Sequence, residues 1–192
     1  MISLLVEFLR KRGRRYLLYL GVAVPAALCH NLLHEAVHYI GAIVFGEGVT
    51  AFRFLTNGWG TSQVVFSMPV EQRVGGHWLV VAWAPSIVTT LLGYGLYAAR
   101  SVAGRHPVSR YAWLYAGFFF LLLDPFYMSL LSLAVGGDVE AAAAVGLPVW
   151  PVQAVAAAVL LFNVRLFTRW QKEVQEARVA TEEMQPGAHG GG

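Results

Sequence analysis

"YLLYLGVAVPAALCHNLLHEAVHYIGAIVF", residues 16–45, is the stretch that decides the fold of this 192-residue chain. It contains one acidic residue, Glu35, and no Lys, Arg or Asp. A helix needs about 20 predominantly apolar residues to cross the hydrocarbon core of a bilayer. Leu28 is too large for a signal-peptide cleavage site before Cys29, and the apolar run continues past it. Residues 16–45 are therefore predicted to form a retained transmembrane helix.

Three further segments are long and apolar enough to cross a membrane. They are His77–Ala99, Tyr111–Val135 and Leu147–Phe167. Across the chain 57% of the residues are hydrophobic and 13% are charged, whereas a soluble domain carries about 25% charged residues. This composition excludes an ordinary soluble enzyme. It predicts an all-α membrane protein with about four transmembrane helices.

The Lys and Arg residues are distributed unevenly between the two sides of the predicted helices. Of the 14, only Arg53 and Arg73 follow the first segment and precede the second. Positive residues are enriched in cytoplasmic loops, so both termini are expected in the cytoplasm, with the protein in a prokaryotic plasma membrane. This orientation accounts for the net charge of +3, and no nucleic-acid partner is expected. The other basic residues are Arg10, Lys11, Arg12, Arg14, Arg15, Arg100, Arg105, Arg110, Arg165, Arg169, Lys172 and Arg178.

The loop between the first two segments contains "AFRFLTNGWGTSQVVFSMP" at residues 51–69. Aromatic and β-branched residues flank the pair Asn57-Gly58, which is typical of a two-residue hairpin turn. We expect a small β-hairpin in this first extracytoplasmic loop. The chain then divides into a basic amphipathic segment at 1–15, one membrane domain at 16–170, and a charged, then disordered, tail at 171–192.

The first predicted helix carries the motif His34-Glu35-x-x-His38. Residues four apart share one helix face, so both histidines can reach one metal ion, with Glu35 beside them as a general base. Ionisable residues inside a span cost roughly 2.5–3.5 kcal/mol each on insertion scales, and zinc would compensate for all three. His30 is one turn earlier. Because eight helical residues span about 12 Å, His30 and His38 cannot share an ion, and His30 is expected to support the site or to pack.

A catalytic zinc ion usually takes three protein ligands and keeps one position open. The chain has two aspartates, Asp124 and Asp138, both near the end of the third apolar segment. Asp124 lies within that segment, at a depth similar to that of the histidines. Asp138 follows Gly136 and Gly137, which could let the backbone bend and direct the carboxylate inward. The residues alone leave both aspartates open as the third ligand.

Together these features resemble the site-2 protease family of intramembrane zinc metalloproteases. They are the motif helix "NLLHEAVHYIGAIVFGEGV", a hairpin, a span with a small residue before proline ("VAWAPSIVTTLLGYG"), and a Gly-Asp pair after a third span. The resemblance extends from about Leu32 to Trp150. The family's aspartate is followed by glycine, whereas Asp124 precedes proline and Asp138 precedes valine. The segment "GGDVEAAAAVGLPVW" is similar to divergent members, which favours Asp138 over Asp124.

The resemblance implies a minimal family member without a PDZ domain. Zn²⁺ would be held by His34, His38 and Asp138, with Asp124 as the alternative third ligand and Glu35 as the catalytic residue. The implied reaction is hydrolysis of a peptide bond in or near a transmembrane segment. The expected partners are therefore a membrane-protein substrate and the lipid bilayer, and the sequence does not indicate an oligomeric state.

Other functions fit parts of the same pattern. A non-proteolytic membrane protein could bind haem or metal through histidines, for example by pairing His34 with His77 or His106, without using Glu35. A catalytically silent protease relative would keep the zinc site without turnover. The three motif residues could also form a buried polar patch that binds no metal.

Overall fold

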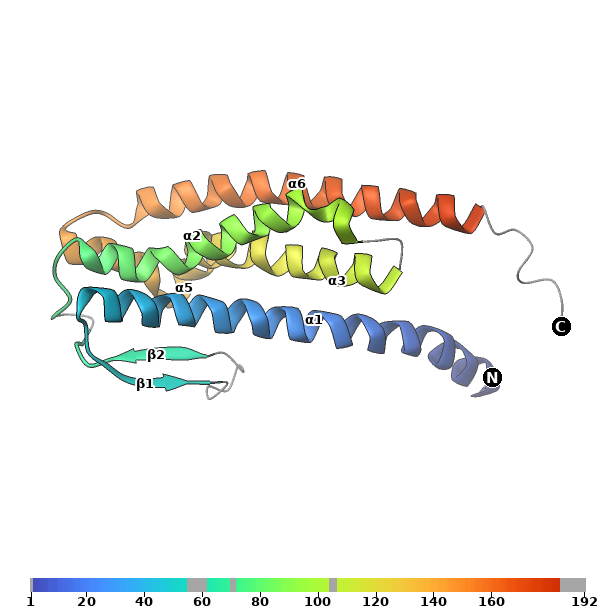
Figure 1. Cartoon of the computed structure of the whole chain (residues 1–192), viewed down its shortest axis with the longest axis horizontal. Coiled ribbons are helices and arrows are strands. Elements are labelled where there is room, and N and C mark those ends of the chain that lie inside the picture. Colours follow the sequence, from blue (N-terminus) through green and yellow to red (C-terminus); the bar gives the residue numbers. More distant parts are fainter. Residues whose placement is uncertain (1, 55–61, 70–71, 104–106, 184–192) are drawn as a thin grey trace.

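The chain folds into long helices, with one small β-hairpin packed on the first of them (Figure 1). The computed structural model describes residues 2–54, 62–69, 72–103 and 107–183. The predicted all-α membrane fold with a hairpin after the first span is confirmed. Within the described residues, four helical stretches are long and apolar enough to cross a membrane: Tyr19–Phe45, His77–Ala98, Ser109–Val135 and Trp150–Ala177.

The third of these stretches consists of several short helical elements, whereas the others lie within single helices. The π-helices are η3 (Phe119–Leu123) and η4 (Tyr127–Leu131), and the 3-10 helices are η2 (Arg100–Ala103) and η5 (Asp138–Val145). The strands β1 (Val49–Arg53) and β2 (Gln63–Phe66) pair antiparallel. The helical elements are α1 (Ile2–Phe45), α2 (His77–Ala98), η2 (Arg100–Ala103), α3 (Pro107–Phe118), η3 (Phe119–Leu123), α4 (Asp124–Phe126), η4 (Tyr127–Leu131), α5 (Ser132–Val135), η5 (Asp138–Val145) and α6 (Trp150–Glu183).

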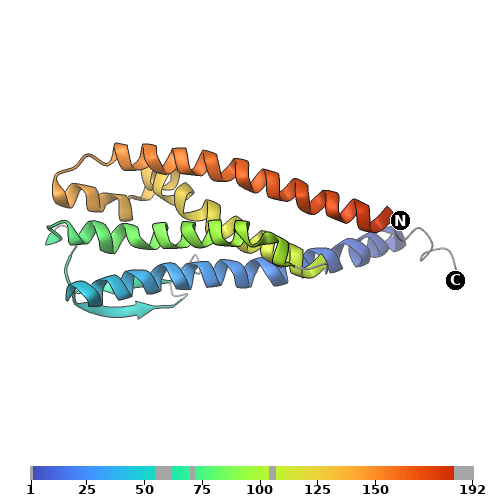
Figure 2. The ribbon, with the colours of Figure 1, turned by 45° about the horizontal axis from the view of Figure 1, so that its top comes forward.

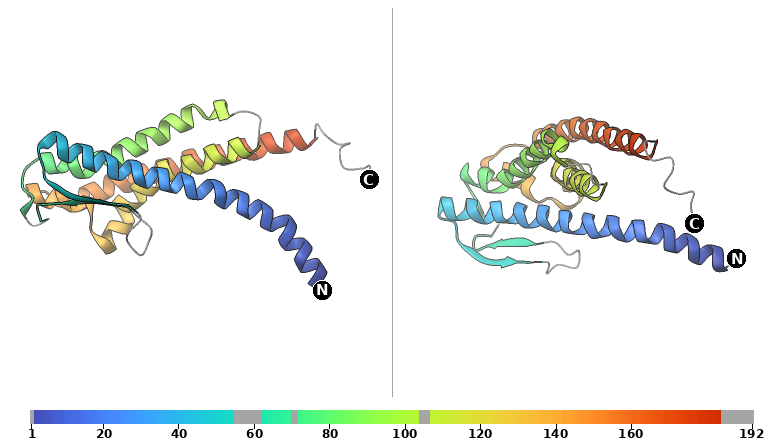
Figure 3. Two further views of the ribbon diagram at one scale, coloured as in Figure 1. Left: turned by 60° about the horizontal axis from the view of Figure 1, so that its bottom comes forward. Right: turned by 45° about the vertical axis from the view of Figure 1, so that its right-hand side comes forward.

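α1 lies between the hairpin and the other helices (Figure 1). It packs against α2 and α3, while β2 contacts its opposite side. α6 covers the third span, where it packs against α3, η3, α4 and η4 (Figure 2). The first half of α1 diverges from the other helices (Figure 3). The start of α1 and the end of α6 lie at the same end of the molecule, as four crossings require.

The segments predicted to flank the membrane domain are continuous with its helices. α1 begins at Ile2, so residues 2–15 of the expected basic segment are helical and join the first span without a break. α6 extends to Glu183, which includes the charged first part of the tail. The Asn57-Gly58 turn and residues 184–192 lie outside the described residues.

The third span is interrupted at Asp124-Pro125. Pro125 has no backbone N–H, so it cannot donate an α-helical hydrogen bond to the carbonyl of Leu121, four residues earlier. The fully buried Asn163 of α6 donates from Nδ2 to this carbonyl at 2.6 Å. The π-helices η3 and η4 flank the same point, and π-helical turns are frequent at functional sites. α6 thus stabilises an interruption that leaves Asp124 inside the bundle.

Polar and apolar side chains are arranged as a lipid environment requires. Large apolar side chains face outward, among them Val44, 71% exposed, and Leu161, 66% exposed. Ionisable groups lie inside, with His30 2% and Asp124 3% exposed. Lipid cannot hydrogen-bond to such groups, so they must find partners within the bundle.

Candidate metal centre

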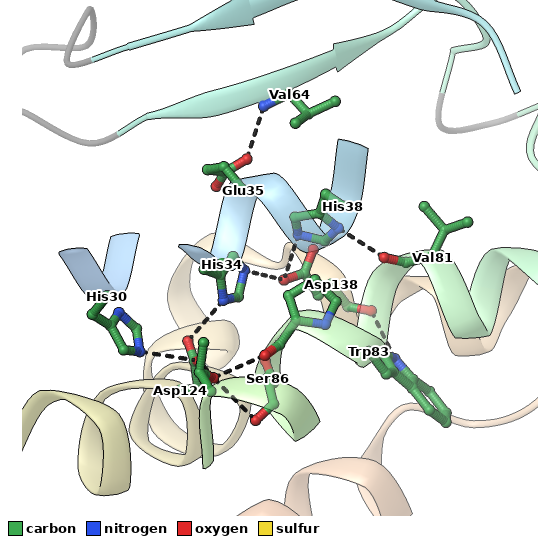
Figure 4. A network of polar contacts seen from close by, with 12 residues as sticks. His30, His34, Glu35, His38, Val64, Val81, Trp83, Ser86, Asp124 and Asp138 are labelled. Atoms are coloured by element: carbon green, nitrogen blue, oxygen red, sulfur yellow. Dashed lines mark hydrogen bonds and ion pairs between the residues drawn. The ribbon is translucent and has the colours of Figure 1, made fainter. Parts of the chain in front are cut away.

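α1 places His34 and His38 on the face of the helix that packs against the bundle, while Glu35, beside them, faces the hairpin (Figure 4). His34 and His38 are buried, and their ring centroids lie 4.9 Å apart. One ligand atom from each of His34, Glu35 and His38 lies within 4.8 Å of the others. The regular spacing of the helix therefore brings together a His/Glu group that could hold a metal ion (Figure 4).

Asp138 approaches the two histidines from the start of η5. Its Oδ2 lies 3.5 Å from Nε2 of His34 and 3.5 Å from Nε2 of His38. Ligands that are about 2.0–2.1 Å from a tetrahedral zinc ion lie about 3.3–3.4 Å from one another. The two nitrogen–oxygen distances therefore match edges of a zinc coordination tetrahedron.

Two glycines direct Asp138 towards the histidines. Gly136 and Gly137 have φ angles of +67° and +95°, a conformation that residues with a side chain rarely adopt. A Cβ atom on Gly137 would also overlap the hydroxyl of Tyr127. The indole Nε1 of Trp83 donates to the carbonyl of Asp138 at 2.9 Å. The carboxylate is thus aimed by backbone geometry and by partners from two other elements.

Asp138 is in the protonation state that a metal ligand needs. Burial on its own would raise the pKa of this carboxyl group, but the neighbouring imidazoles of His34 and His38 lower the pKa to about 2. The side chain is therefore ionised at neutral pH. Metal binding requires the deprotonated carboxylate, so Asp138 itself has no proton to lose before an ion binds.

His38 is oriented by a backbone carbonyl of α2. Pro85 has no N–H, so the carbonyl of Val81, four residues earlier, lacks its helical partner. Nδ1 of His38 lies 2.8 Å from this oxygen. Because a carbonyl oxygen only accepts, Nδ1 carries the hydrogen and Nε2 keeps its lone pair on the side of Asp138. Metal-binding histidines commonly use their second nitrogen in this way.

Asp124 contacts His34 on the other side of the imidazole ring from Asp138. Its Oδ1 lies 3.1 Å from Nδ1 of His34, and its Oδ2 lies 3.2 Å from Nε2 of His30 (Figure 4). The hydroxyl of Thr89 donates to the same Oδ2. The alternative third ligand therefore lies behind His34, whereas Asp138 faces both Nε2 atoms.

The hairpin closes the site over Glu35. The amide of Val64 in β2 donates to Oε2 of Glu35 at 2.8 Å, and the amide of Ser62 donates to Oδ1 of Asn31 at 2.7 Å. Two strand residues and four helical residues both span about 6–7 Å. The Ser62–Asn31 contact therefore lies one such step along the helix from the Val64–Glu35 contact. Side chains of α1 thus satisfy two amides along this edge of the hairpin.

The other histidines considered from the sequence have different surroundings. Nε2 of His77 pairs with Oε1 of Glu47 at 2.7 Å, where α2 begins next to the end of α1. His106 lies outside the described residues.

Sequence reasoning did not identify Asn31 or Val81 as contributors to the site. Asn31 is one helical turn before Glu35, and Val81 is four residues before Pro85. The first spacing indicates a shared helix face, and the second indicates a carbonyl without a helical partner. Both signals were present in the sequence, but neither indicates what its partner is.

Comparisons with models of known protein families, with curated proteins and with solved structures found no significant match for this chain. The motif and the geometry of the site are therefore the features of this chain that indicate a function.

Proposed function

We propose that the protein is an intramembrane zinc metalloprotease similar to the site-2 protease family. The observation that carries the proposal is the position of one carboxylate oxygen of Asp138, 3.5 Å from Nε2 of both His34 and His38. Both rings direct Nδ1 to other acceptors, the carboxylate of Asp124 and the carbonyl of Val81. This arrangement keeps both Nε2 atoms for a shared ion, which a polar patch without metal would not need.

The donor set fits zinc. Two imidazole nitrogens and one carboxylate form a three-ligand set of the kind found in catalytic zinc sites, where the fourth position stays open. His34, His38 and Asp138 would hold the ion. A bound zinc ion would supply Lewis acidity, which polarises a carbonyl group and makes water a nucleophile near neutral pH.

Glu35 is the general base in this proposal. The oxygen of a water molecule bonds to the scissile carbonyl carbon while Glu35 takes the proton. The proton then passes to the nitrogen of the peptide bond as the carbon–nitrogen bond breaks. The amide of Val64 holds Oε2 of Glu35 at 2.8 Å. This contact fixes the carboxylate and leaves Oε1 to accept the proton.

The substrate in this proposal is another membrane protein. The histidines belong to a helix long and apolar enough to cross a membrane, so the bond within reach is in or next to a transmembrane segment. A helical substrate must unwind locally because its carbonyls are held in internal hydrogen bonds, and we expect helix-breaking residues near the cut. The distribution of Lys and Arg supports cytoplasmic termini, and the membrane in this proposal is a prokaryotic plasma membrane.

A catalytically silent zinc-binding relative is the second candidate. Oε2 of Glu35 already accepts a hydrogen bond from the hairpin. A carboxylate that serves only to dock the hairpin would leave the site without a base. Such a protein would bind zinc and other membrane proteins without turnover.

The substitution Glu35→Gln tests the proposal. Membranes that contain the wild type should gain new protein termini within transmembrane segments of other proteins, which mass spectrometry can identify. These termini should be absent with Glu35→Gln, while the zinc content of the purified protein is unchanged. Glu47→Gln is the matched control, because it makes the same chemical change at a residue paired with His77, and cleavage should persist.

The alternatives give different results in the same experiment. Bound zinc without new termini in wild-type membranes would favour the silent relative. A Soret absorption band in the purified protein would contradict both candidates, because it would indicate haem. Cleavage that persists in Glu35→Gln would show that Glu35 is not the base.

A further inference from the structure

A second layer of ionisable side chains lies behind the candidate zinc ligands. His30 and Asp124 are 2% and 3% exposed, and they come from different elements, α1 and α4. In the proposed site neither residue is a ligand. Burial of such groups in a membrane protein commonly marks a function, so a role in the site is expected for this pair.

The contacts form a continuous chain from Asp138 into the bundle. Oδ2 of Asp138 faces Nε2 of His34 at 3.5 Å, and Nδ1 of the same ring faces Oδ1 of Asp124 at 3.1 Å. Oδ2 of Asp124 then faces Nε2 of His30 at 3.2 Å and accepts a hydrogen bond from Thr89. Carboxylate and imidazole alternate along the chain (Figure 4). Each nitrogen of the His34 ring therefore has its own acidic neighbour.

Close nitrogen–oxygen contacts connect this second layer, although their geometry falls short of an aligned hydrogen bond. Among the described residues, Nδ1 of His34 and both nitrogens of His30 make no aligned hydrogen bond. The nitrogen–oxygen distances of 3.1 Å and 3.2 Å are nevertheless within hydrogen-bonding range. In a low-dielectric interior such contacts act strongly on the position of a proton.

We propose that Asp124, held by His30 and Thr89, is a positioning residue for His34. By facing Nδ1, the carboxylate keeps the hydrogen on that nitrogen, so the lone pair of Nε2 is available to zinc. The inference rests on the proposed zinc site and deepens it. It gives Asp124 a role in the site that differs from that of a ligand.

His38 also has an acceptor at Nδ1, supplied by a different helix. Nδ1 of His38 is oriented by the carbonyl of Val81, which Pro85 leaves without a helical partner. Asp124 precedes another proline, Pro125, at the interruption of the third span. In both cases an irregular helix supplies an acceptor to Nδ1. Two separate acceptors on the same atom of the two rings indicate positioning in preference to chance burial.

Zinc affinity of the purified protein tests the inference, measured by competition with a chromogenic chelator. Asp124→Asn keeps the size of the side chain and removes its charge. We expect the affinity to fall about 10–100-fold, as for other partners of metal-binding histidines, with the same zinc stoichiometry at saturation. Ser129→Ala is the matched control. Ser129 is a buried hydroxyl on the same span that donates to the carbonyl of Pro125, and its removal should leave the affinity unchanged.

Variants at His30 provide a second route if Asp124→Asn does not fold. His30→Ala removes one support of Asp124 and should weaken zinc binding less than Asp124→Asn does. His30→Gln restores an N–H donor and should recover most of the affinity. A residue that only fills space would not show this rescue, because alanine and glutamine would then differ in stability and not in zinc affinity.

Nuclear magnetic resonance of ¹⁵N-histidine-labelled, zinc-loaded protein gives a readout that does not depend on catalysis. The wild type should show a strongly deshielded hydrogen on Nδ1 of His34, because a carboxylate accepts from it. In Asp124→Asn this signal should move towards the position of an ordinary imidazole N–H.

The outcomes separate this inference from the proposed function. Unchanged zinc affinity and an unchanged His34 signal in Asp124→Asn would overturn the inference and leave the zinc site intact. If folded Asp124→Asn loses zinc completely while Asp138→Asn retains it, Asp124 is a ligand and the inference is wrong. If the wild type binds no zinc, or if His34→Ala and His38→Ala bind it as well as the wild type, the proposed function fails and the inference fails with it.

Discussion

α1 and the third span contribute to the same site in different ways. α1 is a single helix from Ile2 to Phe45, and its regular geometry brings the motif histidines onto one face. The third span is interrupted by two π-helices and is followed by two glycines with positive φ. Asp124 within this span and Asp138 just after it reach the histidines because of these irregularities. Residue spacing therefore predicts a site on a regular helix, but not the partners that an interrupted segment supplies.

The irregular region should be most sensitive at Gly137. Gly137→Ala combines a backbone conformation with φ +95° and ψ −141°, which is nearly confined to glycine and costs about 1–3 kcal/mol, with overlap against the Tyr127 hydroxyl, which adds about 1–3 kcal/mol. We expect a large fall in the thermal unfolding midpoint and weaker zinc binding, because Asp138 follows directly.

Gly146→Ala is the control for backbone strain alone. Gly146 has a φ of +74°, and nothing lies within 4 Å of the position of a Cβ atom. The free energy of unfolding of this variant should fall by about 1–2 kcal/mol, and its zinc affinity should be unchanged. If the two variants lose the same amount of stability and the same amount of zinc affinity, the close contact at Gly137 does not orient Asp138.

The interruption itself can be tested at Asn163. Asn163→Leu leaves the buried carbonyl of Leu121 without its donor, which should cost about 1–3 kcal/mol. Thermal unfolding in detergent measures the loss. Thr168→Val, on the exposed side of α6, should change stability by less than about 0.5 kcal/mol. If Asn163→Leu is as stable as Thr168→Val, α6 does not stabilise the interrupted span.

A substitution at Pro85 tests the orientation of His38 separately from the stability of α2. Pro85→Ala returns an N–H to the helix, which then competes with His38 for the carbonyl of Val81. We expect zinc affinity to fall up to about tenfold, while the unfolding midpoint stays the same or rises. A fall in both quantities would indicate that Pro85 matters for packing and not for the orientation of His38.

The smallest effect is expected on the regular helix, at Asn31. Asn31→Ala removes the acceptor of the Ser62 amide, and one such hydrogen bond contributes about 0.5–1.5 kcal/mol. Hydrogen exchange should become faster at Ser62, while the bond between Glu35 and Val64 keeps the Val64 amide protected. Equal acceleration at both amides would mean that the two contacts form and break as one unit.

The fold was predictable because a bilayer imposes its own length on each apolar segment. The third span was expected at Tyr111–Val135 and is found at Ser109–Val135. The hairpin was predicted from aromatic and β-branched residues around a turn signal. In the structure β1 ends at Arg53 and β2 begins at Gln63. Hydropathy could not predict the π-helices, because they depend on contacts with α6 that are distant in sequence.

The candidate site was predictable only in part. The positions of His34, Glu35 and His38 follow from the helical period. The choice between Asp124 and Asp138 did not follow, because depth in the membrane and motif resemblance favoured different residues. Their places depend on a proline and on two glycines that bend the backbone, and the direction of a bend is set by packing. The sequence could therefore identify both carboxylates as candidates. It could not predict which of them lies at Nδ1 of His34 and which at Nε2.

X-ray absorption at the zinc edge tests the central claim most directly, with purified wild-type protein and Asp138→Asn. The account predicts zinc in the wild type with two imidazole nitrogens and oxygen ligands at about 2.0–2.2 Å. It also predicts loss of zinc, or of one oxygen ligand, in Asp138→Asn. A wild-type protein without zinc, or a spectrum that is identical in the two proteins, would contradict the claim that His34, His38 and Asp138 form a metal centre.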